Sequence, residues 1–112
     1  VAVAYFHVDA DPEILTGLAD RHDGLVVAGA GDGIVSLLWE ARLRELCKRG
    51  IPVVRATRVP DGAVLRNAGM PDDDIGTIAA DTLSPEKARV LLMLSLTLTR
   101  DTGRIQTFFW QY

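Results

Sequence analysis

The sequence has 112 residues, of which 48% are hydrophobic and 24% charged, with a formal net charge of −3 at pH 7. This length suits one domain and is too short for two, and the acidic balance disfavours nucleic acid and anionic membranes as partners. The single cysteine, Cys47, excludes an intrachain disulfide and a cysteine-ligated zinc site. No apolar run reaches the roughly 18 residues that a membrane span needs.

The first half of the chain alternates between strand-like and helix-like segments. Apolar runs rich in β-branched residues predict three buried strands, over residues 1–8, 25–28 and 51–56. Asp11 as N-cap and Pro12 in the first turn predict a helix that ends near Arg21. A second helix is expected over residues 34–49, because Gly50 suits the left-handed position after a helix end. Its apolar stripe consists of Val35, Trp39, Leu43, Leu46 and Cys47, which makes the cysteine a small core residue rather than a nucleophile.

The second half begins with a long loop over residues 57–74, which contains three consecutive aspartates. Long loops in compact domains are usually functional or mobile. A short fourth strand is expected over residues 75–79. Ser84 as N-cap predicts a third helix, which we expect to be buried on several sides because residues 88–98 are apolar nearly all round. Asp101 begins a last short helix whose apolar residues recur at helical spacing, namely Ile105, Phe108, Phe109 and Tyr112.

This order of elements predicts an α/β fold. We expect a small three-layer domain, with a mostly parallel sheet of about four strands, helices on both faces and right-handed crossovers. In such folds ligands gather at the carboxyl ends of the strands. Those ends carry residues 9–11, the glycine-rich stretch within VVAGAGDGI at residues 26–34, and residues 57–74. A functional site is therefore expected among these three segments.

The glycine-rich stretch does not fit a nucleotide-binding motif. A dinucleotide fingerprint has the spacing G-x-G-x-x-G, which Gly29 and Gly31 match, but Ile34 takes the place of the third glycine. Asp32 would also repel a pyrophosphate, and the lysine of a P-loop is missing. A tight strand-to-helix turn explains the glycines on local grounds. A phospho-receiver domain is disfavoured as well, because the third strand is followed by Thr57 and not by an aspartate.

No complete catalytic or metal-binding set can be assembled from the chain. His7 and His22 have no second ligand at metal spacing, and residues 72–74 read as a solvated loop rather than a cation site. The hydroxyls of Ser36 and Thr57 lie near strand ends, but no histidine or lysine is placed by the sequence to activate them. We therefore predict no catalytic residue, no metal and no cofactor.

Three stretches together resemble the C-terminal domain of the bacterial type II L-asparaginases, in the asparaginase and glutaminase family. They are DGLVVAGAGDG, KRGIPVVRATRVPDGAV and DTLSPEKARVLLMLSLTLTRDTGRIQTFFWQY, in the family's order and spacing. The resemblance implies that residues 1–112 form one C-terminal domain, and that the N-terminal domain with the threonine nucleophile lies outside this chain. It implies hydrolysis of L-asparagine to L-aspartate and ammonia by the complete enzyme, without a cofactor. The compartment stays open between periplasmic, secreted and cytoplasmic.

The resemblance also implies that this domain lends residues to the rim of a neighbouring subunit's active site. The family's asparagine or serine in the glycine-rich loop corresponds to Ile34, with Gly31, Asp32 and Gly33 as the supporting loop, and its glutamate corresponds to Gly69. Neither Ile34 nor Gly69 offers a polar side chain, which leaves Asp32 or residues 72–74 as replacements. We expect the isolated chain to be inactive.

Two alternatives remain beside the enzyme domain. One is a non-catalytic interaction or oligomerisation module, and the other is an amidase of altered specificity. In either case we expect self-association into a dimer or tetramer, with Ile34, Trp39 and residues 57–74 as the surfaces. The expected partners are further copies of the chain, the asparaginase N-terminal domain and a small amide substrate.

Overall fold

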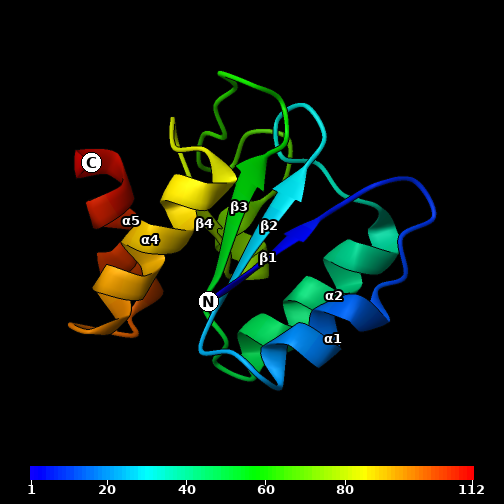
Figure 1. The fold of residues 1–112 in the computed structure, drawn as a ribbon, viewed down its shortest axis with the longest axis horizontal. Coiled ribbons are helices and arrows are strands. Elements are labelled where there is room, and N and C mark those ends of the chain that lie inside the picture. The colour runs from blue at the N-terminus through cyan, green and yellow to red at the C-terminus, as the bar shows by residue number, and fades with distance from the viewer.

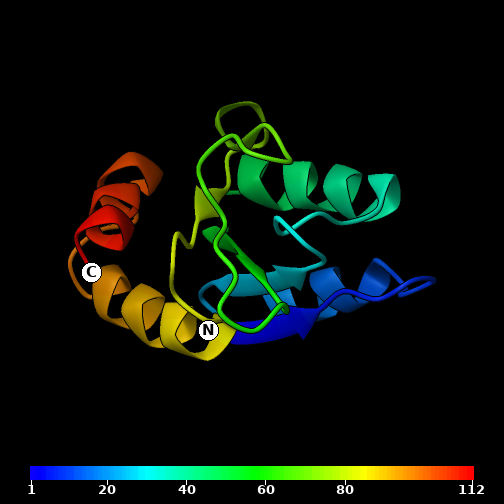
Figure 2. The same cartoon turned by 90° about the horizontal axis from the view of Figure 1, so that it is seen from above.

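Figure 1 shows the computed structural model, which describes residues 1–112 as three layers with a sheet in the middle. Four parallel strands lie in the order β1 (Ala2–Tyr5), β2 (Leu25–Gly29), β3 (Val53–Thr57) and β4 (Ile78–Ala79). One face is covered by α1 (Glu13–Ala19), α2 (Leu37–Lys48) and the short α3 (Asp72–Ile75). The other face is covered by α4 (Pro85–Leu96) and α5 (Thr102–Gln111), which Figure 2 shows on the flank opposite α1 and α2. The predicted α/β fold with a parallel sheet and helices on both faces is confirmed.

The central strands are buried on both faces, which explains why they read as continuous apolar runs. Successive side chains of a strand point to opposite faces. Val27 of β2 accordingly packs beneath α1 and α2, whereas its neighbour Val26 packs beneath α4 and α5. β3 breaks the apolar run once, at Arg55, which pairs in register with Val27 and is fully buried.

Three predicted boundaries are wrong. The first strand is shorter than residues 1–8 and ends at Tyr5. α2 begins at Leu37 rather than at residue 34, because the Ser36 Oγ accepts a hydrogen bond from the Trp39 N–H at 3.2 Å and so caps the helix there. The fourth strand has only two residues, since Ile75 belongs to α3, which ends at Gly76 with φ of 101°.

The cap residues at the other helix ends behave largely as predicted. Ser84 caps α4 by accepting from the Lys87 N–H, and Asp101 caps α5 by accepting from the Arg104 N–H. Gly50 has the left-handed φ of 84° after α2. Asp11 differs, because α1 begins at Glu13 with Pro12 in the cap position, although the Asp11 carboxylate accepts from the Glu13 N–H at 2.9 Å.

Trp39 lies in the core and not on the surface. Only 1% of the residue is exposed, and its ring packs edge-on against Phe6 with centroids 5.2 Å apart. The indole Nε1–H donates to the Ala10 carbonyl at 2.8 Å, so the one polar atom of the side chain is paired. This overturns Trp39 as a surface for self-association.

α4 is less buried than its composition predicts. Ala88 and Leu92 are fully buried against the sheet, but the opposite side of the helix is open. Its exposed apolar side chains are those of Val90, Met93 and Leu94, followed by Leu98 just beyond the helix. The expectation of burial on several sides is therefore wrong for this chain. With twelve residues, the longest helices lack the length and apolar character for crossing a bilayer.

Candidate functional site

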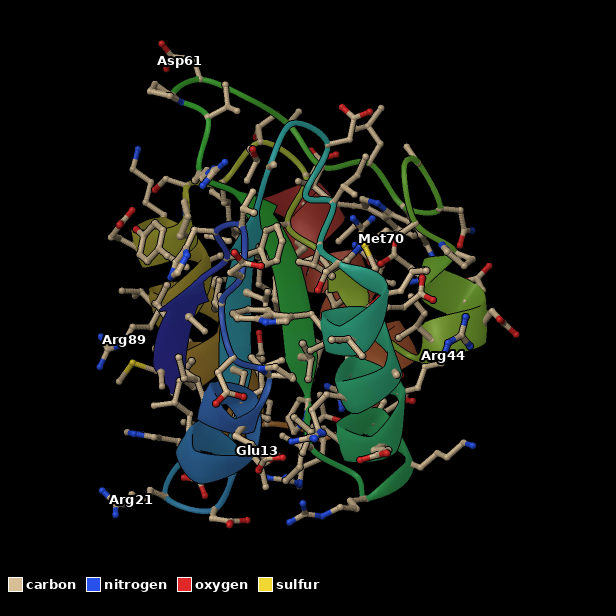
Figure 3. All side chains as sticks on the ribbon, turned by 90° about the vertical axis from the view of Figure 1, so that its right-hand side faces the viewer. Glu13, Arg21, Arg44, Asp61, Met70 and Arg89 are labelled. Carbon is tan, nitrogen blue, oxygen red and sulfur yellow. The ribbon has the colours of Figure 1, made fainter.

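Two loops rise above the carboxyl ends of β2 and β3, at the edge where parallel sheets bind ligands (Figure 1). We call residues 30–36 the glycine-rich loop and residues 58–71 the β3–α3 loop. Figure 3 shows the β3–α3 loop running across this edge from Asp61, on one side, to Met70, which lies beside α2. Both loops therefore lie at the edge of the sheet where the sequence predicts a functional site.

The glycine-rich loop is a tight turn that depends on its glycines. Ala30 and Ile34 exchange two backbone hydrogen bonds of 2.9 and 2.8 Å across the turn. Gly31 and Gly33 have φ of 50° and 78°, in the left-handed region that favours glycine. A side chain at Gly29 would place its Cβ 2.4 Å from the Gly33 backbone. Local backbone geometry thus accounts for the glycine spacing, and Asp32 is exposed at the tip.

The β3–α3 loop meets the glycine-rich loop at Gly69. A Cβ at Gly69 would lie 3.0 Å from the Asp32 Cβ and 3.2 Å from the Ile34 Cγ1, and its φ of 76° also favours glycine. Ile34 is 44% exposed beside it. The structure therefore brings together Ile34, Asp32 and Gly69, and a side chain at position 69 would require its neighbours to move.

The three consecutive aspartates have three different environments. Asp73 is exposed and accepts hydrogen bonds from Asn67 and Arg66, which hold the pKa of its carboxyl below the usual value. Asp74 is exposed and pairs with Arg44 at 2.9 Å. Asp72 is fully buried. The prediction of a solvated segment is wrong for Asp72, because its carboxylate turns inward to an arginine that the sequence reasoning overlooked.

That arginine is Arg55 of β3. Its guanidinium donates to Asp72 through two hydrogen bonds, from Nε at 2.6 Å and from Nη2 at 2.8 Å. The remaining donors reach three backbone carbonyls, those of Asp32 at 3.0 Å, Gly33 at 3.1 Å and Ala68 at 3.1 Å. All five N–H groups of the side chain are used. The available signal was a charged residue inside the apolar run VVRAT, because a buried arginine needs a partner.

The Asp72 carboxylate is equally well satisfied. Besides Arg55, it accepts from the Thr77 hydroxyl at 2.5 Å and from the Asn67 N–H at 2.9 Å. No buried side-chain nitrogen or oxygen in the chain lacks a hydrogen-bond partner. The ion pair is thus part of a hydrogen-bond network in which every buried side-chain polar atom is paired, and which contacts both the glycine-rich loop and the β3–α3 loop.

Asp32 differs from these aspartates. Its carboxylate accepts no hydrogen bond and forms no ion pair, a property that it shares, among the five carboxylates of the two loops and α3, with Asp61 alone. Its backbone carbonyl is held by Arg55, whereas its side chain is exposed. An unpaired carboxylate beside Gly69, on a backbone that Arg55 holds in place, can bind a cationic group of a ligand.

The other polar residues considered from the sequence serve local structure. The Thr57 hydroxyl accepts from the Val59 N–H at 3.1 Å, as Ser36 does at the start of α2. Burial raises the pKa of Cys47 to about 11, with a smaller contribution from the charge of Asp72, so its thiol is protonated at neutral pH. No group of three histidine, cysteine, aspartate or glutamate side chains lies close enough to hold a metal ion.

A polar cavity of about 330 Å³ lies between the β3–α3 loop and the first turn of α4. Two of its ionisable side chains, those of Tyr5 and Glu86, are hydrogen-bonded to each other. The tyrosine hydroxyl donates to the glutamate, which raises the pKa of Tyr5 and lowers that of Glu86. This cavity lies apart from the meeting point of Asp32 and Gly69.

Residues 1–109 match the family model of the glutaminase/asparaginase C-terminal domain. The chain is 41% identical over 110 residues to a protein named probable L-asparaginase periplasmic of Haemophilus influenzae, covering 97% of this chain and 32% of that protein. It is 41% identical over 113 residues to L-asparaginase 2 of Escherichia coli, covering all of this chain and 32% of that protein. A glutaminase-asparaginase of Acinetobacter glutaminasificans is 45% identical over 89 residues, which cover 79% of this chain and 27% of that protein.

The chain therefore spans about a third of the length of these relatives. The match extends over both loops of the candidate site and over all four strands. The chain belongs to the glutaminase/asparaginase C-terminal domain family.

Proposed function

We propose that this chain is the C-terminal domain of an asparaginase-type amidohydrolase, and that it contributes to the rim of an active site in a neighbouring subunit. The rim consists of Ile34, Asp32 and Gly69. The observation that carries the proposal is the meeting of two loops at the carboxyl edge of the sheet, where Gly69 lies against Asp32 and Ile34. The complete protein would hydrolyse an amide, with the nucleophile supplied outside residues 1–112.

The residues at this edge are suited to binding a substrate rather than to catalysing its hydrolysis. The nearby hydroxyls of Ser36 and Thr57 both accept backbone hydrogen bonds, and neither is hydrogen-bonded to a side chain that could act as a base. Asp32 supplies the negative charge that Gly69 does not, and would pair with an ammonium group of the substrate. A hydrogen bond to a charged group contributes about 1.5–3 kcal/mol. Ile34 adds an apolar wall, which is the basis for an altered preference among amides.

Ammonia release tests this proposal directly. We expect the 112-residue chain alone to release none from L-asparagine or L-glutamine, and the full-length protein to release it from at least one of them. In the full-length protein, Asp32→Ala is expected to raise the KM of that amide about tenfold or more, since the charged hydrogen bond is lost.

The matched control is Asp61→Asn, which removes the other unpaired carboxylate, on the side of the β3–α3 loop away from Met70 (Figure 3), while tolerating the φ of 57°. This variant should keep the KM of the unmodified protein. Turnover by the isolated chain, or an unchanged KM in Asp32→Ala, would contradict the proposal.

We further propose that the chain self-associates, through an apolar groove between α4 and α5. The groove has a volume of about 690 Å³, and most of its lining is apolar, with Val90, Leu94, Leu98, Phe108 and Tyr112 among the residues. Leu94 is 59% exposed and Leu98 67% exposed. A contiguous apolar patch of this kind is typical of an interface. A second copy of the chain brings an equally apolar surface, because a twofold contact pairs a patch with itself.

Sedimentation velocity tests the groove. The chain is expected to form dimers at micromolar concentrations, and Leu94→Glu to remain monomeric, because a charge would be buried in the interface. Leu38→Glu on α2 is the control, since Leu38 is 70% exposed outside the groove, and it should dimerise normally. A monomeric unmodified chain at high concentration, or dimers in Leu94→Glu, would exclude this interface.

A further inference from the structure

We infer that Arg55 is a positioning residue, which joins the glycine-rich loop and the β3–α3 loop into one rigid unit. Arg55 belongs to β3, and its side chain lies beneath both loops with no exposed surface. Its backbone contacts fall on the proposed rim residues or directly before them. Asp32 belongs to the rim, Gly33 precedes Ile34, and Ala68 precedes Gly69. One core side chain thereby sets the relative position of the two halves of the rim.

Asp72 also holds the β3–α3 loop in position, at Asn67, two residues before Gly69. Its Oδ2 accepts from the Arg55 Nη2 and from the Asn67 N–H, while its Oδ1 accepts from the Arg55 Nε and from the Thr77 hydroxyl. Asn67 has a φ of 63°, a left-handed conformation that asparagine tolerates and that this hydrogen bond helps to hold. The chain from Asn67 to Gly69 is therefore tied to the core at two successive residues.

Lysine cannot take over these contacts. Its ammonium has three donors and no planar fork, whereas the Arg55 guanidinium uses five donors in directions that its plane determines. The packing between the guanidinium and the glycine-rich loop is also close. A Cβ at Gly33 would lie 3.1 Å from the Arg55 Nη1, so the glycine lets the loop backbone rest directly on the guanidinium.

Stability alone does not account for an ion pair at this place. Apolar residues of similar volume often stabilise a core as well as a buried ion pair does or better. The particular property of Arg55 and Asp72 is that their hydrogen bonds end on two loops separated by more than thirty residues of sequence. Orientation of those loops is what apolar residues could not provide.

Hydrogen exchange measured by mass spectrometry on the full-length protein tests the coupling. In Arg55→Lys, peptides covering residues 30–35 and residues 66–70 are expected to exchange about tenfold faster, both together, while peptides of β2 and α4 keep their rates. Arg58→Lys is the matched control, because the exposed Arg58 donates to the Phe6 carbonyl and not to either rim segment. It should leave both peptides unchanged.

A change confined to one loop, or to neither, would overturn the inference, and so would faster exchange of the same size throughout the domain. If Arg55→Lys does not fold, Asp72→Asn takes its place. This variant keeps the shape of the side chain but removes the charge that anchors the guanidinium, and the same joint loosening of both peptides is expected.

A kinetic measurement on the same variant provides a second test, which rests on the proposed function. If the two loops form a substrate rim, Arg55→Lys raises the KM of the amide about tenfold and leaves kcat within about threefold, because the nucleophile lies elsewhere. Joint loosening with an unchanged KM would exclude the rim function and leave the coupling in place. Unchanged exchange would exclude the coupling whatever the kinetics show.

Discussion

Asp72→Leu is expected to lower the free energy of unfolding by about 3–5 kcal/mol, because it leaves the Arg55 guanidinium buried without its counter-ion. Both side chains are 0% exposed, so water cannot replace the lost carboxylate. Thr77 and the Asn67 N–H lose their acceptor as well. For a domain whose total stability is about 5–15 kcal/mol, this is a large share. Urea denaturation followed by circular dichroism measures the change.

Asp74→Leu is the matched control within the same triplet. Asp74 is exposed and its ion pair with Arg44 lies at the surface, so the expected loss is below about 1 kcal/mol. The double variant Arg55→Met with Asp72→Leu should be more stable than Asp72→Leu alone, since no charge is left in the core. Equal losses in Asp72→Leu and Asp74→Leu would show that the buried pair does not carry this energy.

The second large effect is expected from Trp39→Ala. Removing this side chain leaves a cavity between α2 and the segment after β1, beside Phe6, and deprives the Ala10 carbonyl of its donor, which together should cost about 3–5 kcal/mol. Trp110→Ala removes the same group from an exposed site, where 56% of the residue is accessible and the contact with Arg66 is a cation–π one at 5.8 Å. Its cost is expected below about 1 kcal/mol.

Thermal or urea unfolding compares the two tryptophan variants under identical conditions. The expected difference comes from the burial of Trp39 and its hydrogen bond to Ala10, because the two side chains have the same size. A larger loss in Trp110→Ala than in Trp39→Ala would contradict the placement of Trp39 in the core. It would also return Trp39 to the surfaces that self-association could use.

The exposed face of α4 shows what the composition of a helix can and cannot predict about its burial. Residues 88–98 are apolar nearly all round, which predicts burial on several sides, yet only the side with Ala88 and Leu92 meets the sheet. The pattern shows how much apolar surface a helix has, but not which molecule covers it. In our proposal a second copy of the chain covers the remainder.

The candidate site was predictable only in part. Its edge of the sheet follows from the order of strands and helices, and the positions Ile34 and Gly69 follow from the family resemblance. Their contact with Asp32 required the folded chain. The folded chain was also needed to show the different environments of Asp72, Asp73 and Asp74. They are neighbours in the sequence but pair with three different arginines.

The sequence by itself determined the alternation of buried strands and helices, the parallel sheet and the caps at Ser84, Asp101 and Gly50. The elements and their caps depend on residues within three or four positions of one another, so their signals lie in short stretches, and the parallel sheet follows from the order of those elements. Only the tertiary structure decided that Arg55 binds Asp72 and three carbonyls of two loops. Those groups lie 13 to 23 residues from Arg55 along the chain, and the order of strands in the sheet brings them together.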